Sequence, residues 1–314
     1  MSHTVARETR MSFPAQIEPT PLNGLKAWRL RHGDTEALVT SQGAQVLGFG
    51  VNGEPPIVWA NPNARFVPGE PIRGGIPVCW PWFGALQANP EVVQSGYKSQ
   101  AEAPFHGLVR QAEWALDGMH ADTERTQIWF SYQTSPSLTP AWPHAANLKL
   151  QVAVQDAQLR VTLTVCNTGD SALAITQALH TYFATSDVRK VELRGFDGFD
   201  FYDCLDSWIP RQQRGEPLIE GETDRIYQGL GDRLVIDDPN WGRQIVIRTT
   251  GSNSAILWNP WVDKSTRLDQ FASTSWKSML CIETARVMDN LLLVRPGANA
   301  EMSVTISREV ILPL

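Results

Sequence analysis

The segment 173–183, LAITQALHTYF, places one histidine at the end of a stretch that reads as a β-strand. Successive side chains of a strand point to opposite faces, so His180 shares a face with Thr176 and Ala178. Small side chains on that face would leave a hollow with the imidazole at its rim. Imidazole exchanges protons near neutral pH, which makes His180 a candidate for proton transfer. The alternative is a histidine that ends the strand and bonds to the backbone.

A second titratable group lies in an apolar strand pattern. In the segment 279–284, MLCIET, Glu283 shares a face with Met279 and Cys281. Apolar surroundings raise the pKa of a carboxyl group, and burial of an unpaired carboxylate is costly in free energy. Glu283 is therefore a second candidate for chemistry. The alternative is a structural ion pair with Arg286 or another arginine.

The segment 71–84, PIRGGIPVCWPWFG, is too rich in glycine and proline to form a regular strand. Two glycines follow Arg73, and glycine allows the backbone to approach a ligand closely. The spacing of a nucleotide-binding glycine loop is absent from this segment. We therefore expect a stiff loop that presents Arg73 to a ligand, or alternatively a structural loop in which Arg73 is solvated.

His106 and Arg110 are four residues apart in the segment 105–110, FHGLVR. On a strand, this even separation places both side chains on one face. A neutral donor and a cation on one face could hold hydroxyl groups and an anionic group, and a surface pair is the alternative. Asp224 lies in the segment 223–227, which reads as a connection, where aspartate usually takes part in turns.

The elements that must position these residues are short strands separated by Gly, Pro, Asn and Asp. The clearest is a hairpin over 147–167, in which apolar and polar residues alternate on both sides of a turn near Asp156 and Ala157. A helical turn is expected at 267–271, and no segment predicts a long amphipathic helix. Further strands are expected at 25–30, 36–40, 45–51, 114–116, 126–132, 190–194, 199–203, 233–236, 244–249, 255–258, 290–294 and 301–310.

This pattern predicts an all-β chain. We expect a large antiparallel β-sandwich with few short helices, because sheets with one apolar face are stable only when they pack on another layer. No repeat or linker divides the chain, so a single domain is expected over 1–314, with residues 1–20 as a peripheral N-terminal segment.

Length, charge and cysteine content exclude several classes of protein. The 314 residues carry a net charge of −6, so we expect no surface for nucleic acid or an anionic membrane. The four cysteines form no CxxC pair, which argues against a zinc site, and three lie among apolar residues as in proteins of reducing compartments. Residues 1–10 lack the apolar run of a signal peptide, and no segment is long and apolar enough to span a bilayer. A cytoplasmic protein is expected.

The ordered motifs RGGIPVCWPWFG, HGLVR, LHTYF, TDRIY, WNPW and MLCIET, within residues 22–310, resemble the glucose-6-phosphate 1-epimerases of the aldose 1-epimerase family. This resemblance implies a galactose mutarotase-like β-sandwich with a cleft across one concave sheet. Many relatives have glutamine before the His-Gly pair where this chain has Phe105, so a backbone group or an aromatic face would have to supply that sugar contact. By position, the resemblance makes His180 the general acid and Glu283 the general base, and it assigns sugar phosphate binding to Arg73, His106, Arg110 and Asp224.

The activity that the resemblance implies is interconversion of the α and β anomers of a hexose 6-phosphate, D-glucose 6-phosphate above all. Glu283 would accept the proton of the C1 hydroxyl while His180 protonates the ring oxygen. The ring opens, the C1–C2 bond rotates, and reclosure reverses both transfers. Arg110 and Arg73 would hold the phosphate through guanidinium donors. No metal or cofactor is expected, and a small sugar phosphate is the only partner expected for a monomer.

Other functions fit the same residue types. A non-catalytic sugar-phosphate binding module would bind its ligand without accelerating anomer exchange, and an epimerase of unphosphorylated aldoses would use the same acid and base. A glycoside-cleaving enzyme needs two carboxylates that flank the bond. Glu283 and Asp224 could form such a pair, but both histidines would then have no role.

Overall fold

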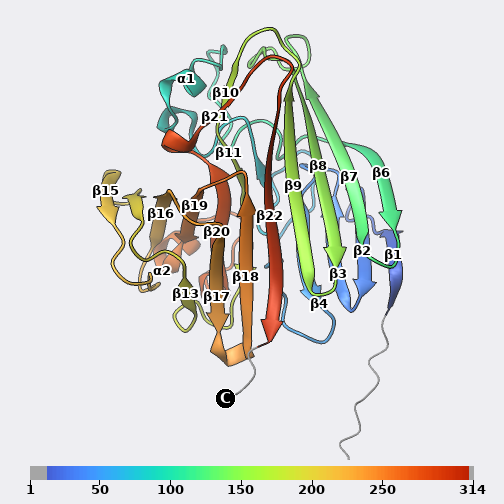
Figure 1. Cartoon of the computed structure of the whole chain (residues 1–314), viewed down its shortest axis with the longest axis vertical. Coiled ribbons are helices and arrows are strands. Elements are labelled where there is room, and N and C mark those ends of the chain that lie inside the picture. Colours follow the sequence, from blue (N-terminus) through green and yellow to red (C-terminus); the bar gives the residue numbers. More distant parts are fainter. Residues whose placement is uncertain (1–12, 311–314) are drawn as a thin grey trace, which may run out of the picture.

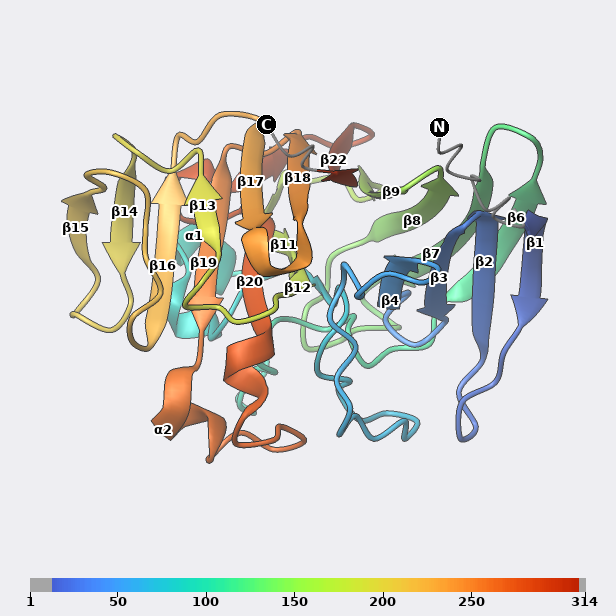
Figure 2. The same ribbon diagram turned by 90° about the horizontal axis from the view of Figure 1, so that it is seen from below.

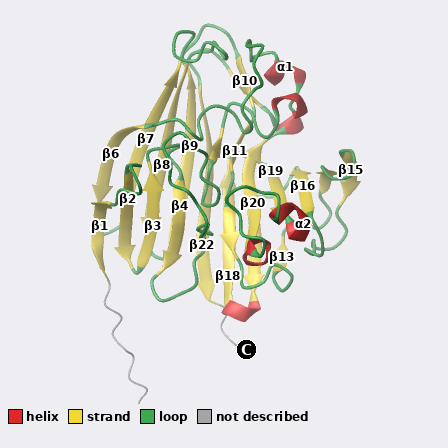
Figure 3. Ribbon diagram, turned by 180° about the vertical axis from the view of Figure 1, so that it is seen from behind, coloured by secondary structure: helices red, strands yellow, loops and turns green. Residues whose placement is uncertain are grey.

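The computed structural model describes residues 13–310. Strands dominate and the helices are few and short (Figure 3). Among the described residues, every pairing between named strands is antiparallel. The prediction of an all-β antiparallel sandwich is therefore confirmed. No helix within the described part of the chain is long and apolar enough to cross a membrane.

Two eight-stranded sheets form most of the molecule (Figure 1). We call the first the outer sheet, because strands such as β8 and β9 alternate between buried and more exposed residues. Its order is β13 (Glu192–Arg194), β17 (Arg233–Asp238), β18 (Arg243–Thr250), β22 (Asn299–Val310), β9 (Gln158–Asn167), β8 (Ala146–Gln155), β7 (Thr126–Thr134) and β6 (Ala115–Ala121).

We call the second the inner sheet, because its central strands are buried on both faces. Its order is β15 (Ile209–Gln212), β14 (Asp200–Asp203), β16 (Thr223–Gln228), β19 (Ser254–Asn259), β20 (Met279–Arg286), β11 (Gln177–Leu179) and β5 (Val78–Cys79), and β12 (Tyr182–Ala184) also pairs with β20.

Smaller elements complete the fold. A four-stranded sheet lies at the end of the molecule opposite β14 and β15 (Figure 2). It consists of β1 (Phe13–Pro19), β2 (Ala27–Gly33), β3 (Thr35–Thr40) and β4 (Val46–Val51), and a two-stranded sheet pairs β10 (Leu173–Ile175) with β21 (Leu292–Val294). The helices are η1 (Leu86–Ala88), α1 (Glu91–Gln94), η2 (Pro239–Trp241), α2 (Trp261–Ser265), η3 (Ser275–Ser278) and η4 (Met288–Asn290).

Strand β20 shows how the core is arranged. Leu280 and Ile282 belong to the large apolar core that also contains residues of the outer sheet. Met279 and Cys281 point to the other face of the inner sheet and belong to a second apolar cluster. Because Glu283 follows in the same alternation, its side chain also lies on this second face. The inner sheet therefore has one face for the core and one face for a site.

The strand predictions are largely confirmed, above all the hairpin. Strands β8 and β9 pair along their whole length around a turn in which Ala157 has a φ of 50°. The segment 173–183 is divided at Thr176 into β10 and β11, and His180 follows β11 directly. Of the expected peripheral segment 1–20, residues 1–12 lie outside the described residues, and the next residues form β1 at the edge of its sheet.

Three local predictions are wrong. The segment 223–227 is no connection but most of β16, which pairs on both sides. Residues 105–110 form turns and bends in place of a strand, and His106 has a φ of 67°. The helical turn expected at 267–271 lies earlier in the chain, as α2, since Pro260 precedes the helix at its N-cap.

Candidate active site

The pairing register of the inner sheet gathers residues from distant parts of the sequence on its second face. Asp224 on β16 lies opposite Trp258 on β19, and Ile256 on β19 lies opposite Glu283 on β20. On the other side of β20, Leu179 pairs with Thr284, so the next residue, His180, comes level with Glu283. Neighbouring strands are about 5 Å apart, which brings both side chains within reach of each other.

A pocket of about 370 Å³ lies on this face. All six residues that the resemblance assigns to the site line it, whether they come from strands or from loops. The structure thus brings together Arg73, His106, Arg110, His180, Asp224 and Glu283.

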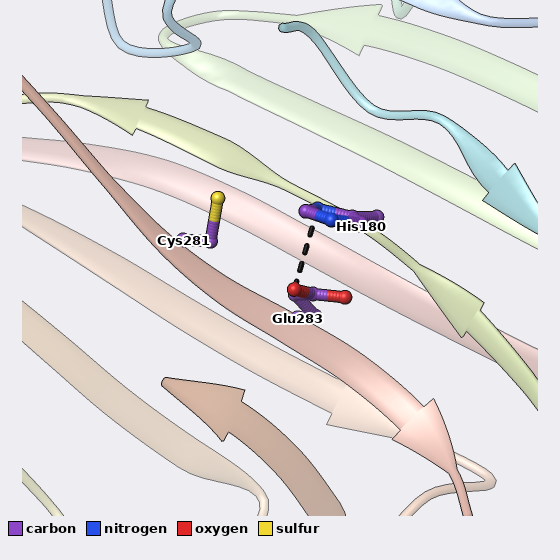
Figure 4. Close-up of side chains that lie close together, drawn as sticks. All are labelled: His180, Cys281 and Glu283. Atoms are coloured by element: carbon purple, nitrogen blue, oxygen red, sulfur yellow. Dashed lines mark ion pairs between the residues drawn. The ribbon is translucent and has the colours of Figure 1, made fainter. Parts of the chain in front are cut away.

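His180 and Glu283 form a buried pair at the base of this pocket. Nδ1 of His180 lies 3.3 Å from Oε1 of Glu283, as Figure 4 shows, and the two residues are 7% and 1% exposed. Neither Nδ1 of His180 nor Oε2 of Glu283 has a hydrogen-bond partner in the described structure, so the 3.3 Å approach is a contact between the two groups and not an aligned hydrogen bond. The imidazole stacks on the ring of Tyr182, with centroids 4.8 Å apart and planes inclined by 4°. The backbone N–H of His180 donates to the carbonyl of Pro77 at 2.9 Å, and this hydrogen bond fixes the position of the His180 backbone.

Burial acts on the two members of this pair in opposite directions. It raises the pKa of Glu283 well above its usual range, assisted by the negative charge of Asp224 and opposed by Arg110. It lowers the pKa of His180 well below its usual range, assisted by the positive charges of Arg110 and Arg73. Burial therefore favours a neutral pair, in which the shared proton is on the carboxyl group.

His106 is fixed in one neutral form. The backbone N–H of Gly84 donates to Nδ1 of His106 at 3.1 Å, so the proton of the neutral ring is on Nε2. Burial, with the neighbouring His180 and Arg110, lowers the pKa of His106 well below its usual range. Its ring centroid lies 5.3 Å from that of His180. His106 is thus a neutral N–H donor beside the His180–Glu283 pair.

Two cations of the pocket have no negative partner. Within residues 13–310, neither Arg73 nor Arg110 forms an ion pair with a carboxylate. Nε of Arg73 donates to the carbonyl of Asp269 at 3.1 Å, and Nε of Arg110 is buried without a partner. Both guanidinium groups line the pocket and can serve an anionic ligand.

Asp224 is the second carboxyl group that lines the pocket, beside Glu283. Burial raises the pKa of Asp224 to about 6, against the opposing charge of Lys264, whose Nζ lies 3.9 Å from Oδ2. Nζ of Lys264 also lies 2.9 Å from Oε1 of Glu222, so this cation is already compensated. The side chain of Asp224 is 27% exposed and lines the pocket.

Comparison with known proteins identifies the family. The model described as aldose 1-epimerase matches residues 26–307, most of the chain. The chain belongs to the aldose 1-epimerase family. A protein of Escherichia coli (strain K12) with the provisional name glucose-6-phosphate 1-epimerase is 30% identical over 255 residues, which cover 81% of each chain. A protein of Cenchrus ciliaris with the same provisional name is 27% identical over 90% of this chain and 84% of its own.

A solved structure supports the same assignment. The crystal structure of a protein from Salmonella typhimurium, provisionally described as a mutarotase, matches this epimerase with a TM-score of 0.82 at 25% identity, over 96% of this chain and 97% of the other. The chain is therefore an isomerase that interconverts sugar anomers. Membership in this family argues against the two other functions considered above, a glycoside-cleaving enzyme and a non-catalytic binding module.

One group of side chains in the described epimerase could hold a metal ion. Donor atoms of His180, Cys281 and Glu283 lie within 4.8 Å of one another (Figure 4). Burial, however, raises the pKa of the Cys281 thiol well above its usual range, and a metal requires the thiolate. Arg110 and Arg73 add two uncompensated positive charges to the same pocket, which oppose a further cation. The arrangement favours proton transfer over metal binding.

The glycines after Arg73 have a different role from the one expected. A Cβ atom on Gly75 would lie 2.1 Å from the carbonyl oxygen of Val46, and its φ is 69°. On Gly74, a Cβ atom would lie 3.1 Å from the backbone nitrogen of Asn61. These glycines therefore allow the loop to approach the protein's own backbone, and the close packing holds Arg73 in place.

Several pocket residues were not found from the sequence. Trp258 and Tyr182 also line the pocket, and each lies in a motif that carried the family resemblance. No pattern in the sequence indicated that Lys264 on α2 belongs to the site. It comes close to Asp224 only because the chain turns between β19 and α2. Phe105 lines the pocket with 62% of its surface exposed, and its ring centroid lies 4.3 Å from that of His106.

Proposed function

We propose that this epimerase acts on a hexose 6-phosphate, with D-glucose 6-phosphate as the first candidate. The observation that carries this proposal is the pair of guanidinium groups, Arg73 and Arg110, which face the pocket without a carboxylate partner among residues 13–310. A phosphate dianion would compensate both charges through forked donors. An unphosphorylated aldose would leave them uncompensated. The names of the relatives from Escherichia coli and Cenchrus ciliaris agree with this choice.

The proposed chemistry uses the single proton of the His180–Glu283 pair. In the reactive form, Glu283 is a carboxylate and His180 an imidazolium. Glu283 takes the proton of the C1 hydroxyl and His180 gives a proton to the ring oxygen, so the C1–O5 bond breaks and a C1 aldehyde forms. Each positioned group contributes about 10²–10⁴-fold to such a reaction. The step leaves a neutral carboxyl and a neutral imidazole, which are the forms that burial favours.

The remaining residues would hold the sugar while it rotates. In our proposal, the Nε2 proton of His106 is donated to an oxygen that gains negative charge, since Nδ1 is already engaged by Gly84. Asp224 would accept hydrogen bonds from sugar hydroxyls. Phe105 would present its exposed ring to the C–H face of the sugar in place of the amide that many relatives have. Rotation about C1–C2 and reclosure then yield the other anomer.

Substitution of Arg110 tests the phosphate assignment. In Arg110→Ala, we expect kcat/KM for glucose 6-phosphate to fall about 10- to 100-fold, since a charge-assisted hydrogen bond contributes about 1.5–3 kcal/mol. The rate with free glucose should not fall with it, because this sugar has no phosphate for Arg110 to hold. Both are measured by anomer-exchange NMR, with Arg125→Ala as the matched control, because Arg125 lies in the exposed turn between β6 and β7. An equal loss for both sugars would place the phosphate elsewhere and favour an epimerase of unphosphorylated aldoses.

A further inference from the structure

The two uncompensated arginines lie next to a proton-transfer pair that is almost completely buried. Nε of Arg110 has no partner, and Nε of Arg73 meets only a neutral carbonyl group. In a pocket lined by protein, charges interact more strongly than in bulk water. The positive field of both arginines therefore reaches His180, whereas Asp224, the other carboxyl group that lines the pocket, acts on Glu283.

This field acts unequally on the two members of the pair. Arg110 and Arg73 both lower the pKa of His180. Of the two, only Arg110 affects the pKa of Glu283, and there it ranks behind burial and the charge of Asp224. Positive charges in the same pocket therefore disfavour the imidazolium form of His180, whereas burial and the charge of Asp224 keep the proton on Glu283. Without a ligand, these influences together favour the inactive arrangement of the pair.

We propose that the phosphate of the substrate activates this pair as well as holding the sugar, because it cancels the positive field of Arg73 and Arg110 and lets the proton move to His180. The inference rests on the proposed function. The proton crosses the 3.3 Å contact from Oε1 of Glu283 to Nδ1 of His180, and no other bond changes. His180 then carries N–H groups on both nitrogens and can donate from Nε2 to the ring oxygen, while Glu283 is free to accept from O1.

The other groups that face the pair do not replace the phosphate. None of them adds a negative charge beside His180, and Asp224 acts on Glu283, where it favours the protonated form. The groups that surround the pair are Cys281 from β20, Tyr182 from β12, Cys79 from β5, Asp224 from β16, His106 and Arg110 from the 105–110 segment, and Arg73 from the loop before β5.

The experiment separates the substrate into two pieces. D-Xylose has the ring of glucose without the C6 group, so it leaves the phosphate position empty, and phosphite dianion can occupy that position. We expect phosphite to raise the enzyme-catalysed rate of xylose anomer exchange in a saturable way. The increase should be about tenfold for each unit by which the pKa of His180 rises. Rates without enzyme, at each phosphite concentration, are subtracted.

Variants show whether the arginines transmit the effect. Arg73→Ala and Arg110→Ala should lose the phosphite activation, expressed as the ratio of each variant's rates with and without phosphite. Arg110→Lys keeps a charge at the position and should retain part of it. Arg125→Ala should behave as the wild type. Activation that persists in both alanine variants would overturn the proposal.

A direct measurement of His180 gives a second readout. In protein with ¹³C-labelled histidine, phosphite should raise the pKa of the His180 imidazole, assigned by comparison with His180→Asn. If glucose 6-phosphate is turned over but phosphite neither accelerates xylose nor moves this pKa, phosphate activation is wrong and the proposed substrate stands. If glucose 6-phosphate is not accelerated at all, the proposed substrate itself is wrong.

Discussion

At the scale of single residues, the site depends on burial that acts oppositely on an acid and a base. Burial disfavours the charged form of each group, so it raises the pKa of Glu283 and lowers that of His180. Since one proton serves both, the neutral pair and the charged pair differ only by a transfer across 3.3 Å. The same burial that makes the resting pair neutral also favours the state that follows ring opening.

Removal of either member of the pair should abolish catalysis. We expect Glu283→Gln and His180→Asn each to lower kcat for glucose 6-phosphate by about 10²–10⁴-fold, the range for one positioned acid or base. Glutamine has the volume of the neutral glutamic acid, so the urea midpoint of unfolding should stay close to that of the wild type. Anomer-exchange NMR and urea titration check both statements. A variant that keeps a near-normal rate would show that its residue has another role.

The pH profile should report the ionisation of Asp224. Its pKa of about 6 means that the carboxylate is lost as the pH falls through 6, so kcat/KM should decrease on the acid side. Asp224→Asn should lower kcat/KM and remove this inflection. In Lys264→Met, loss of the positive charge raises the pKa of Asp224, so the inflection should move to higher pH. An inflection that stays in place in both variants would belong to a different group.

At the scale of elements, strand register and loop packing divide the positioning between them. Strands β16, β19 and β20 place Asp224, Trp258 and Glu283 through their ladder. Arg73 comes from a loop that is fixed by close contact with β4 at Gly75. The strand side chains reach the pocket through the regular alternation of the sheet. Arg73 reaches it only if its loop follows one particular backbone path.

The position of Gly75 tests the loop. Gly75→Ala places a Cβ atom 2.1 Å from the carbonyl oxygen of Val46 at a positive φ, so we expect a loss of more than about 3 kcal/mol in unfolding free energy, and weaker binding of glucose 6-phosphate. The matched control is Gly53→Ala, which has a φ of 77° but open space around the Cβ atom. The control should lose only about 1 kcal/mol, the cost of the positive φ. Equal losses in urea unfolding would mean that the contact with β4 is unimportant.

At the scale of the whole molecule, the inner sheet separates stability from chemistry. Leu280 and Ile282 point into the core shared with the outer sheet, while Glu283 lines the pocket on the opposite face, where Cys281 belongs to the second apolar cluster. Burial of the Glu283 carboxyl group costs free energy. Strand β20 can tolerate this cost because its opposite face packs in the largest apolar core of the described chain.

This separation predicts a variant that loses stability but not chemistry. Ile282 is 1% exposed, so Ile282→Ala should lower the unfolding free energy by about 2–5 kcal/mol through lost burial and a cavity. Because its side chain points away from the pocket, kcat per folded molecule should stay within a few-fold of the wild type. Urea unfolding and kinetics well below the unfolding midpoint check this. A large fall in kcat would mean that the two faces of β20 are coupled.

The amino-acid sequence by itself determined the class of fold, most of the strands and the six pocket residues. Alternation of apolar and polar residues is a local property, so the hairpin of β8 and β9 and the two faces of β20 could be predicted. The six residues were found together only because their motifs resemble one family; from residue types alone, each had a structural alternative.

Only the tertiary structure decided how these residues meet. The distance between His180 and Glu283 depends on the register of β11 and β20, and the absence of a carboxylate beside Arg73 and Arg110 in the described residues depends on every neighbouring segment. Lys264, the true path of the 105–110 segment and the contact of Gly75 with β4 also depend on packing between distant segments. Such contacts leave no periodic signal, because the residues that form them are not neighbours in the chain.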